Sequence, residues 1–192
     1  MRVTGEHNAL NAAASLVVAL ECGLTVEAVK RSLHTFGGVK RRFEFLGTLP
    51  HGGLLYDDYA HHPTEIRKTL LAFKQRFSKH KLICVFQPHT YSRTKKLFED
   101  FLRSFSHADQ VIIVNIYPSL RERQDESISA QRLAQAMIAH HKSVFFLKDS
   151  ANVIKYIKEQ RFRDDTIVVL MGAGDIYKLQ EELVVSEDGQ ST

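Results

Sequence analysis

The sequence predicts an α/β fold, in which a mostly parallel, Rossmann-like sheet carries helices on both faces and follows two separate helices. Two observations lead to this prediction. From about residue 54 onward, segments with strand character alternate with segments of helical period, which is typical of parallel sheets with helical crossovers. Three strand segments are also apolar throughout, as strands covered on both sides should be. They read Leu-Ile-Cys-Val-Phe, Val-Ile-Ile-Val and Ile-Val-Val-Leu-Met.

Two helices are expected near the N-terminus. Residues 8–20 are rich in Ala, Leu and Val at a helical period, and Gly23 follows as a stop signal. Thr25 is placed to cap a second helix. Two helices of this length cannot form a core of their own. We therefore assign residues 1–38 to the end of a preceding domain and residues 39–192 to the α/β domain.

Strands and helices follow one another in order through the second domain. Two strands come first, at 42–49 and 54–58, with a Pro-His-Gly-Gly turn between them. The expected helices are 64–77, 95–105, 131–140, 150–159 and 175–183. The remaining expected strands are 82–86, 110–115, 143–147 and 166–171. Residues 184–192 are expected to form a frayed tail.

The composition is that of an ordinary globular chain of 192 residues, 44% hydrophobic and 25% charged. No apolar stretch approaches the roughly 20 residues that span a bilayer, and no signal-peptide layout opens the chain. Cys22 and Cys84 lie in apolar runs and are expected to be buried, reduced thiols of a cytosolic protein. The net charge of +4 suits an anionic partner, but no nucleic-acid-binding motif is present, so nucleic acid is not expected.

Four polar clusters each follow a predicted strand. They are residues 57–62, 87–93, 117–123 and 172–175. In an open α/β sheet the carboxyl ends of the strands line the ligand crevice, so we expect a binding site at this edge. The plainer alternative is that these segments are polar only because they are loops.

Two of these clusters precede predicted helices. Ser92 and Thr94 are placed to cap the helix expected from about Lys95, and its free N–H groups, with the Arg93 guanidinium, would hold a carboxylate. The Gly-Ala-Gly turn at 172–174 lets the backbone approach a ligand closely, although a simple strand-to-helix connection explains it nearly as well.

The adjacent histidines and arginines each allow two interpretations. His61 and His62 suggest metal ligation at first, but neighbouring side chains point apart and no further ligand stands at a suitable spacing. We expect no metal site here; one imidazole would bind substrate while the other orients the loop. Arg41 and Arg42 are suited to phosphate binding, or else form a salt-bridged strand edge.

Five sequence blocks resemble the Mur ligases and occur in the order found in that family. The blocks are residues 5–11, 41–44, 57–65, 86–94 and 172–176, and the resemblance extends to about residue 182. The histidine-pair and Phe-Gln-Pro-His blocks are similar to those of the L-alanine-adding branch. The murein tripeptide ligase branch has a similar histidine-pair block and stays open as the alternative.

The resemblance implies an ATP-dependent, amide-bond-forming ligase. In this reaction the lactyl carboxylate of UDP-N-acetylmuramate takes the γ-phosphoryl group of ATP, and the amine of L-alanine displaces phosphate from the acyl phosphate. The product is a peptidoglycan precursor, which implies a cytoplasmic role in cell-wall biogenesis, cell shape and cell division. The corresponding fold is the C-terminal, amino-acid-binding domain, with residues 1–38 closing the central ATP-binding domain.

The resemblance also implies a role for each matched residue. Asn8 and Asn11 would contact adenine, Asp58 the ribose hydroxyls and Arg42 the transferring phosphate. The residues expected around the alanine and the acyl centre are Tyr59, His61, His89 and Arg93, with Gly172, Ala173, Gly174 and Asp175 at the substrate's edge. Of these side chains, His61, His89 and Arg42 are the catalytic candidates. Amides, a carboxylate and a guanidinium suit a base edge, hydroxyls and phosphoryl charge respectively.

One departure from the family limits what the chain is expected to do. It has no Gly-x-x-Gly-Lys-Thr phosphate loop, and the Mg²⁺ ligands and the UDP-sugar domain are expected in the missing central and N-terminal parts. We therefore expect no ligase activity from the chain alone. The apolar stripe of Ala12, Leu16, Val17 and Leu20 needs another surface, either the α/β domain or a second copy of the chain through self-association of the N-terminal helices. A non-catalytic nucleotide- or amino-acid-binding module, and a metal hydrolase built on His61 and His62, are the competing hypotheses.

Overall fold

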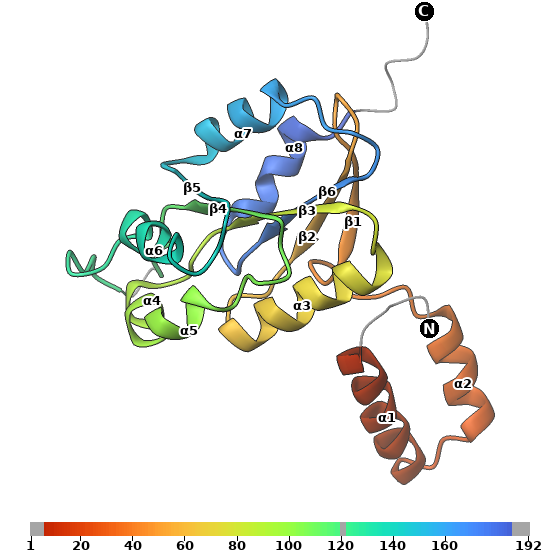
Figure 1. Cartoon of the computed structure of the whole chain (residues 1–192). Helices are drawn as coiled ribbons and strands as arrows, with labels where there is room; N and C mark the ends of the chain where they lie inside the picture. The colour runs from red at the N-terminus through yellow and green to blue at the C-terminus, as the bar shows by residue number, and fades with distance from the viewer. Residues whose placement is uncertain (1–5, 120–121, 186–192) are drawn as a thin grey trace, which may run out of the picture.

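The structure is a computed structural model that describes residues 6–119 and 122–185. Within these residues a six-stranded sheet lies between two layers of helices, and a pair of helices extends from one end (Figure 1). The predicted fold class, a mostly parallel α/β sheet with helices on both faces, is confirmed.

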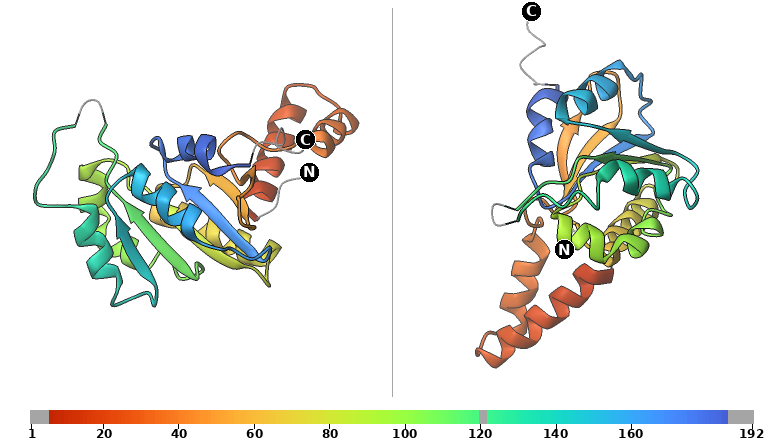
Figure 2. Two further views of the ribbon diagram at one scale, coloured as in Figure 1. Left: turned by 90° about the horizontal axis from the view of Figure 1, so that it is seen from above. Right: turned by 90° about the vertical axis from the view of Figure 1, so that its left-hand side faces the viewer.

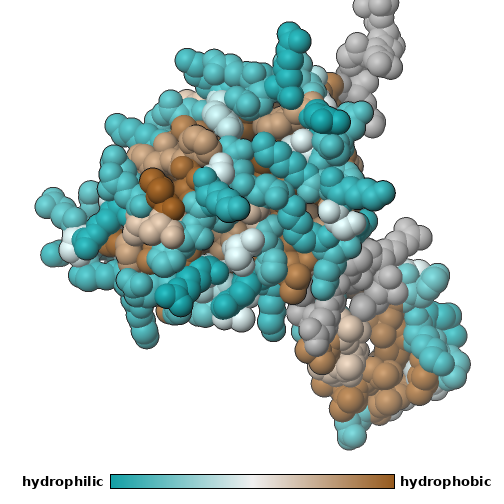
Figure 3. Space-filling model, in the orientation of Figure 1, coloured by the Kyte–Doolittle hydropathy of each residue, from teal (hydrophilic) through white to brown (hydrophobic). Residues whose placement is uncertain are grey.

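The N-terminal helices are α1 (Glu6–Glu21) and α2 (Val26–Thr35). Thr25 caps α2 as predicted, because its hydroxyl oxygen accepts the Ala28 N–H at 3.3 Å. No described side chain of α1 is buried, and in α2 only Val29 is. Apolar surface gathers over this helical pair (Figure 3). The prediction of a buried Cys22 is wrong for the same reason: Cys22 is exposed, whereas Cys84 is buried in the sheet.

The sheet has the strand order β1-β2-β6-β3-β4-β5. The strands are β1 (Glu44–Thr48), β2 (Leu54–Asp58), β3 (Lys81–Phe86), β4 (Gln110–Val114), β5 (Val144–Leu147) and β6 (Thr166–Met171). Only β1 runs antiparallel to its neighbour, β2; the other pairs of adjacent strands are parallel.

Two apolar layers hold the helices to the sheet. The helices are α3 (Pro63–Arg76), α4 (Tyr91–Lys96), α5 (Phe98–Leu102), α6 (Ala130–Met137), α7 (Ser150–Glu159), the 3₁₀ helix η1 (Ile176–Leu179) and α8 (Gln180–Leu183). Successive residues of each strand face opposite layers, so Cys84 packs toward α3, α5 and α6 while Val85 packs toward α7, η1 and α8. Burial of each such side chain stabilises the fold by about 1.5–3 kcal/mol.

The chain connections diverge at the carboxyl edge of β6. The chain leaves β2 and β3 toward the face that carries α3 and α4, but it leaves β6 toward the opposite face, where η1 lies (Figure 2). In open α/β sheets, ligands bind at the carboxyl edge near such a point of divergence.

Several element boundaries differ from the predictions by one to four residues. β1 begins at Glu44 rather than residue 42, because Arg41 and Phe43 have positive φ angles of 62° and 51°, outside the strand region. The helix predicted at 95–105 begins at Tyr91 and divides at Leu97 into α4 and α5.

The predicted helix caps Ser92 and Thr94 are also wrong. Thr90 is the N-cap, and its hydroxyl oxygen accepts the Arg93 N–H at 3.3 Å. Thr94 is buried inside α4 and donates its hydroxyl to the Thr90 carbonyl at 2.7 Å.

The C-terminal segment is attached for at least two residues beyond α8. Val184 packs on the layer beneath α7, and the Val185 N–H donates to the Thr48 carbonyl at 3.1 Å. The predicted fraying is therefore wrong for these two residues, and residues 186–192 lie outside the described part of the chain. None of the described helices combines the length and apolar content that crossing a membrane requires.

Candidate functional site

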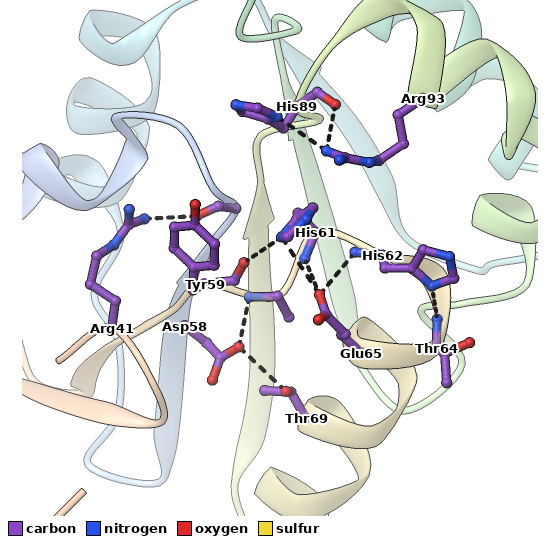
Figure 4. A network of polar contacts seen from close by, with 12 residues as sticks. Arg41, Asp58, Tyr59, His61, His62, Thr64, Glu65, Thr69, His89 and Arg93 are labelled. Carbon is purple, nitrogen blue, oxygen red and sulfur yellow. Dashed lines mark hydrogen bonds and ion pairs between the residues drawn. The ribbon is translucent and has the colours of Figure 1, made fainter. Parts of the chain in front are cut away.

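The four polar clusters predicted from the sequence meet at one edge of the sheet. The loops that follow β2, β3 and β6 lie side by side, and an isolated parallel bridge between His89 and Tyr117 brings in the loop after β4. Figure 4 shows the side chains of this edge, with His61 near its centre and His89 and Arg93 above it. The site is therefore built from segments more than a hundred residues apart in the sequence, and its Arg41–Gly174 contact joins residues 133 positions apart.

His61 is held in one tautomer by its neighbours. Its Nδ1 lies 3.0 Å from the Tyr59 carbonyl oxygen, which can only accept a hydrogen bond, so we infer that the proton is on Nδ1. The Glu65 carboxylate lies 3.6 Å from the same nitrogen. In the neutral ring, Nε2 then carries the lone pair and is available as a base.

His62 points away from His61 and caps α3 (Figure 4). Its Nδ1 accepts the Thr64 N–H at 3.3 Å, and Glu65 accepts the His62 N–H at 3.2 Å in return. The prediction that one histidine orients the loop is confirmed for His62. Among the described residues, no group of three or more His, Cys, Asp or Glu side chains is placed to hold a metal ion.

His89 has the opposite tautomer. Its Nδ1 lies 3.1 Å from Nη1 of Arg93, and a guanidinium can only donate, so Nδ1 of His89 is the acceptor. The remaining proton of the neutral ring is on Nε2. Burial, followed by the nearby Arg93 and His61, lowers the pKa of His89 below its usual value, so the ring is neutral at pH 7.

The two imidazoles thus offer complementary groups to the same space. Their ring centroids are 6.1 Å apart, and the His89 ring also stacks on Tyr117 at 5.7 Å. One ring presents an acceptor Nε2 and the other a donor Nε2–H. Arg93 lies beside them, half-buried, and forms no ion pair with any described carboxylate.

Arg41 and Arg42 have different surroundings although they are adjacent. The Arg41 guanidinium donates to Asp57 at 3.0 Å and to the carbonyls of Gly172 and Gly174 at 2.7 and 3.3 Å. Arg42 is exposed, with its guanidinium carbon 5.6 Å from the Tyr59 ring, and its side chain has no hydrogen bond or ion pair within the described chain. The salt-bridged interpretation therefore applies to Arg41. The Arg42 guanidinium has no protein partner of this kind and is available to bind a ligand.

The Arg41 partner, Asp57, is almost fully buried. One of its oxygens, Oδ1, has no hydrogen-bond partner in the described structure. Burial outweighs the hydrogen bond and the charge of Arg41 and raises the pKa of Asp57 to about 6. Asp58 is buried as well, and its carboxylate accepts from the N–H groups of Phe43 and Ala60, both at 2.9 Å, and from the Thr69 hydroxyl at 3.3 Å.

The turn at residues 172–175 packs against the loop after β3. A Cβ atom at Gly172 would lie 2.6 Å from the Gln87 carbonyl oxygen, and one at Gly174 would lie 2.6 Å from Cγ of Tyr117. The Gln87 side chain donates to Asp175 at 2.9 Å and accepts the Ile176 N–H at 3.1 Å. These glycines admit protein atoms, so the close approach predicted for a ligand is made by Gln87 and Tyr117. Sequence reasoning assigned no role to Gln87, although it lies inside a recognised block.

The first amides of α4, expected to be free, are occupied. The Glu122 carboxylate accepts the N–H groups of Tyr91 at 2.6 Å and of Ser92 at 2.8 Å. The carboxylate-binding position predicted at this helix end is thus filled by the protein's own side chain, from a loop thirty residues away. Any ligand carboxylate is left with the Arg93 guanidinium.

A cavity of about 930 Å³ separates the helical pair from the α/β domain. This volume suits a ligand of nucleotide size. Asn8 and Asn11 of α1 line it on one side, and Arg42 and Asp58 line it on the other. Its apolar wall consists of Ala12, Ala19, Leu24, Ala28, Val29, Leu33, Phe36, Val39 and Phe43. The structure therefore places the residues predicted for the nucleotide around one cavity.

The predicted amino-acid residues form a second, adjoining group. Tyr59, His61, His89 and Arg93 do not line the cavity but lie at the sheet edge next to it, where Arg42 approaches Tyr59. The cavity wall also includes Lys68 of α3, which sequence reasoning did not single out. Its exposed position on a charged helix gave no signal in the sequence.

Comparison with known proteins places these features in a family. A family described as "Mur ligase, glutamate ligase domain" matches residues 41–174. The chain is 43% identical over 184 residues to the UDP-N-acetylmuramate–L-alanine ligase of Desulfitobacterium hafniense, covering 96% of this chain and 40% of that protein. It is 38% identical over 187 residues to the ligase of the same name from Desulfosudis oleivorans, covering 97% and 40%. The chain thus spans about 40% of the length of these curated relatives.

Solved structures give the same result. The UDP-N-acetylmuramate-alanine ligase of Thermotoga maritima matches with a TM-score of 0.75 and 28% identity, over 93% of this chain and 37% of that one. A murein peptide ligase from Psychrobacter arcticus matches with a TM-score of 0.69 and 25% identity, over 94% and 37%.

Proposed function

The chain belongs to the Mur ligase family, and on that premise we propose that it is the C-terminal portion of a UDP-N-acetylmuramate–L-alanine ligase. Residues 39–192 would be the amino-acid-binding domain, and residues 1–38 the end of the central ATP-binding domain. The whole enzyme would add L-alanine to UDP-N-acetylmuramate in the cytoplasm, as a step of peptidoglycan synthesis that serves cell-wall biogenesis, cell shape and division. The names of the curated relatives and the share of their length that is matched support this proposal.

The amino-acid half of the proposal rests on one observation, the different partners of the two Nδ1 atoms, from which we infer opposite tautomers for His61 and His89. The amine of L-alanine must lose a proton as it attacks the acyl carbon, and Nε2 of His61 has the lone pair to take it. Negative charge then develops on the acyl oxygen, and Nε2–H of His89 can donate to it. The C–N bond forms, phosphate leaves with the C–O bonding pair, and the proton stays on His61.

Arg93 is the proposed partner of the alanine carboxylate. L-Alanine has only a carboxylate, an amine and one methyl group, and the amine must stay free to react. Arg93 has no carboxylate partner in the described chain, while Glu122 fills the amides of α4. Its planar fork can bind a carboxylate through two parallel hydrogen bonds, which a lysine cannot do. Tyr59 and the turn at residues 172–175 would bound the same site.

The nucleotide half is assigned to the cavity. Asn8 and Asn11 would contact adenine, Asp58 the ribose through its remaining acceptor capacity, and Arg42 the transferring phosphoryl group. The cavity's apolar wall and its cations fit a nucleotide. Mg²⁺ neutralises phosphate charge in such reactions. The described residues include no cluster that would hold it, so we assign its ligands to parts of the enzyme outside this chain.

A chimera tests the proposal. The matching C-terminal segment of the Desulfitobacterium hafniense ligase is replaced by this chain, and phosphate release is measured with ATP, UDP-N-acetylmuramate and an amine substrate. We expect L-alanine to support release at least about 100-fold better than the tripeptide L-alanyl-γ-D-glutamyl-meso-diaminopimelate. The same ligase without a C-terminal segment is the control and should be inactive. Release with the tripeptide but not with L-alanine would assign the chain to the murein peptide ligases instead.

Substitution of Arg93 in the same chimera tests the proposed site of the alanine carboxylate. Loss of one charge-assisted contact in a closed site costs about 2–4 kcal/mol, or roughly a 30- to 1000-fold loss in kcat/KM. We expect Arg93→Ala and Arg93→Lys to raise the KM for L-alanine and to leave the KM values for ATP and the UDP-sugar nearly unchanged. Arg67→Ala, on the exposed surface of α3, is the matched control. An equal rise in the KM for ATP would show that the carboxylate binds elsewhere.

Self-association is a separate part of the proposal. The isolated chain carries large exposed apolar side chains on α1 and α2, including Leu10, Val17 and Val18 at 61%, 59% and 63% exposure. In the intact ligase they would meet the rest of the central domain, and in the isolated chain a second copy would cover them. Sedimentation of the chain against Val18→Lys would show a dimer that the variant loses.

A further inference from the structure

The cavity is lined by equal numbers of carboxylates and cations, which differ in the partners they have within the protein. Two carboxylates line it, Asp58 and Glu65, and both are used inside the protein. Asp58 accepts hydrogen bonds from backbone and hydroxyl donors, and Glu65 accepts the N–H groups of His61 and His62, each at 3.2 Å.

The two cations of the cavity, Arg42 and Lys68, have no hydrogen-bonded partners, although the charge of Arg42 acts at longer range on both carboxylates. Neither side chain forms a hydrogen bond or an ion pair with the described part of the chain. Their guanidinium and ammonium donors are therefore left for an anionic ligand.

The two cations are also placed apart. Arg42 lies at the amino-acid end, because its guanidinium carbon is 5.6 Å from the Tyr59 ring, whose centroid is 5.4 Å from that of His61. Lys68 lies on α3 one turn beyond Thr64, which is about 6 Å farther along the helix axis from the His62 cap. Thr64, Glu65, Lys68 and Thr69 share the helix face that forms the cavity wall.

We propose that Lys68 binds the α-phosphate of the nucleotide, while Arg42 faces the phosphoryl group that is transferred. This inference rests on the proposed nucleotide site. In the proposed orientation, the base lies at Asn8 and Asn11 and the terminal phosphate lies at Arg42. The ribose and the α-phosphate would then lie between these two ends of the cavity. Lys68 is the unpartnered cation on that stretch of wall, and its flexible stem carries three donors.

The proposed contact between Lys68 and the α-phosphate can be tested with ligands that carry no, one or two phosphates. The chain is titrated with adenosine, AMP and ADP at low salt, and Kd values are read from amide chemical shifts. In Lys68→Gln we expect about 5- to 20-fold weaker binding of AMP and ADP, with adenosine unchanged, because only the phosphate contact is lost. Arg67→Gln removes the same charge from the adjacent position on α3, away from the cavity, and should change each Kd less than twofold.

Each other outcome contradicts the inference. Unchanged AMP binding in Lys68→Gln means that Lys68 does not contact the α-phosphate, and weaker adenosine binding means that it contacts the base or sugar. Equal losses in Lys68→Gln and Arg67→Gln mean a general effect of surface charge. If the unaltered chain binds none of the three ligands, the proposed nucleotide site fails and Lys68 loses its role with it.

Discussion

The sheet edge and the helical pair contribute to the same site in contrasting ways. At the sheet edge the fold holds each polar side chain: Arg41 by Asp57, His61 by the Tyr59 carbonyl and His89 by Arg93. On α1, Asn11 is exposed and no described side chain is buried. The amino-acid half is thus organised before any ligand arrives, whereas the nucleotide half depends on a helical pair whose apolar surface is largely uncovered (Figure 3).

The largest expected effect is a difference in how substitutions in the α/β domain and in the helical pair change the free energy of unfolding. Phe73 of α3 is 1% exposed and stacks on Phe43 with ring centroids 3.8 Å apart, so Phe73→Ala should lower the free energy of unfolding by about 3–5 kcal/mol. Val18→Ala on α1, where the side chain is 63% exposed, should change it by less than about 0.5 kcal/mol. Urea unfolding monitored by circular dichroism gives both values. A loss of more than about 2 kcal/mol from Val18→Ala would mean that the helical pair is folded onto a core after all.

A smaller effect should come from the Arg41–Asp57 pair as the pH changes. The pKa of Asp57 is raised to about 6 in the folded chain, so the folded state binds its proton more tightly than the unfolded state does. This contribution to stability is fully present below the unfolded pKa of about 3.9 and is lost as the pH rises through about 6. Between pH 8 and pH 5 it should stabilise the fold by about 1–1.5 kcal/mol.

The variant Asp57→Asn isolates this contribution because asparagine does not titrate. Unfolding free energies of the unaltered chain and of Asp57→Asn are compared at pH 5 and pH 8. The difference between the two proteins should move by about 1–1.5 kcal/mol in favour of the unaltered chain at pH 5. A constant difference would show that Asp57 is already ionised at pH 5 and that its pair with Arg41 offsets the cost of burial.

Much of the fold could be predicted because its signals are local. The strands β2 and β6 and the helix α7 were predicted to the residue, since apolar runs bounded by Asp58, Asp149 and the glycine turn mark their ends. Other boundaries depend on backbone conformations that residue type does not reveal. Thr90 caps α4 with a φ of 71°, and nothing distinguishes that threonine from Ser92 in the sequence.

The sequence predicted where the polar clusters would lie, but it did not predict which of their side chains would be bound by other protein groups. The clusters that follow the strand ends lie together, as predicted. Arg41 and Arg42, however, are the same residue type at adjacent positions, so the sequence does not distinguish them. Only the fold shows that the first is used by Asp57 and the second is not. Glu122 could not be anticipated either, because its contact with α4 joins residues thirty positions apart. Tertiary partners of this kind decide which polar groups remain for a ligand.

The central claim is that two imidazoles at the sheet edge present opposite groups to one substrate. Long-range ¹H–¹⁵N spectra of the chain labelled with ¹⁵N-histidine report the tautomer of each ring directly. At pH 7.5 we expect His61 with its proton on Nδ1 and His89 with its proton on Nε2, assigned by comparison with His61→Gln and His89→Gln. If both rings had the same tautomer, or if His89 were protonated on both nitrogens, the assignment of one base and one donor would be contradicted.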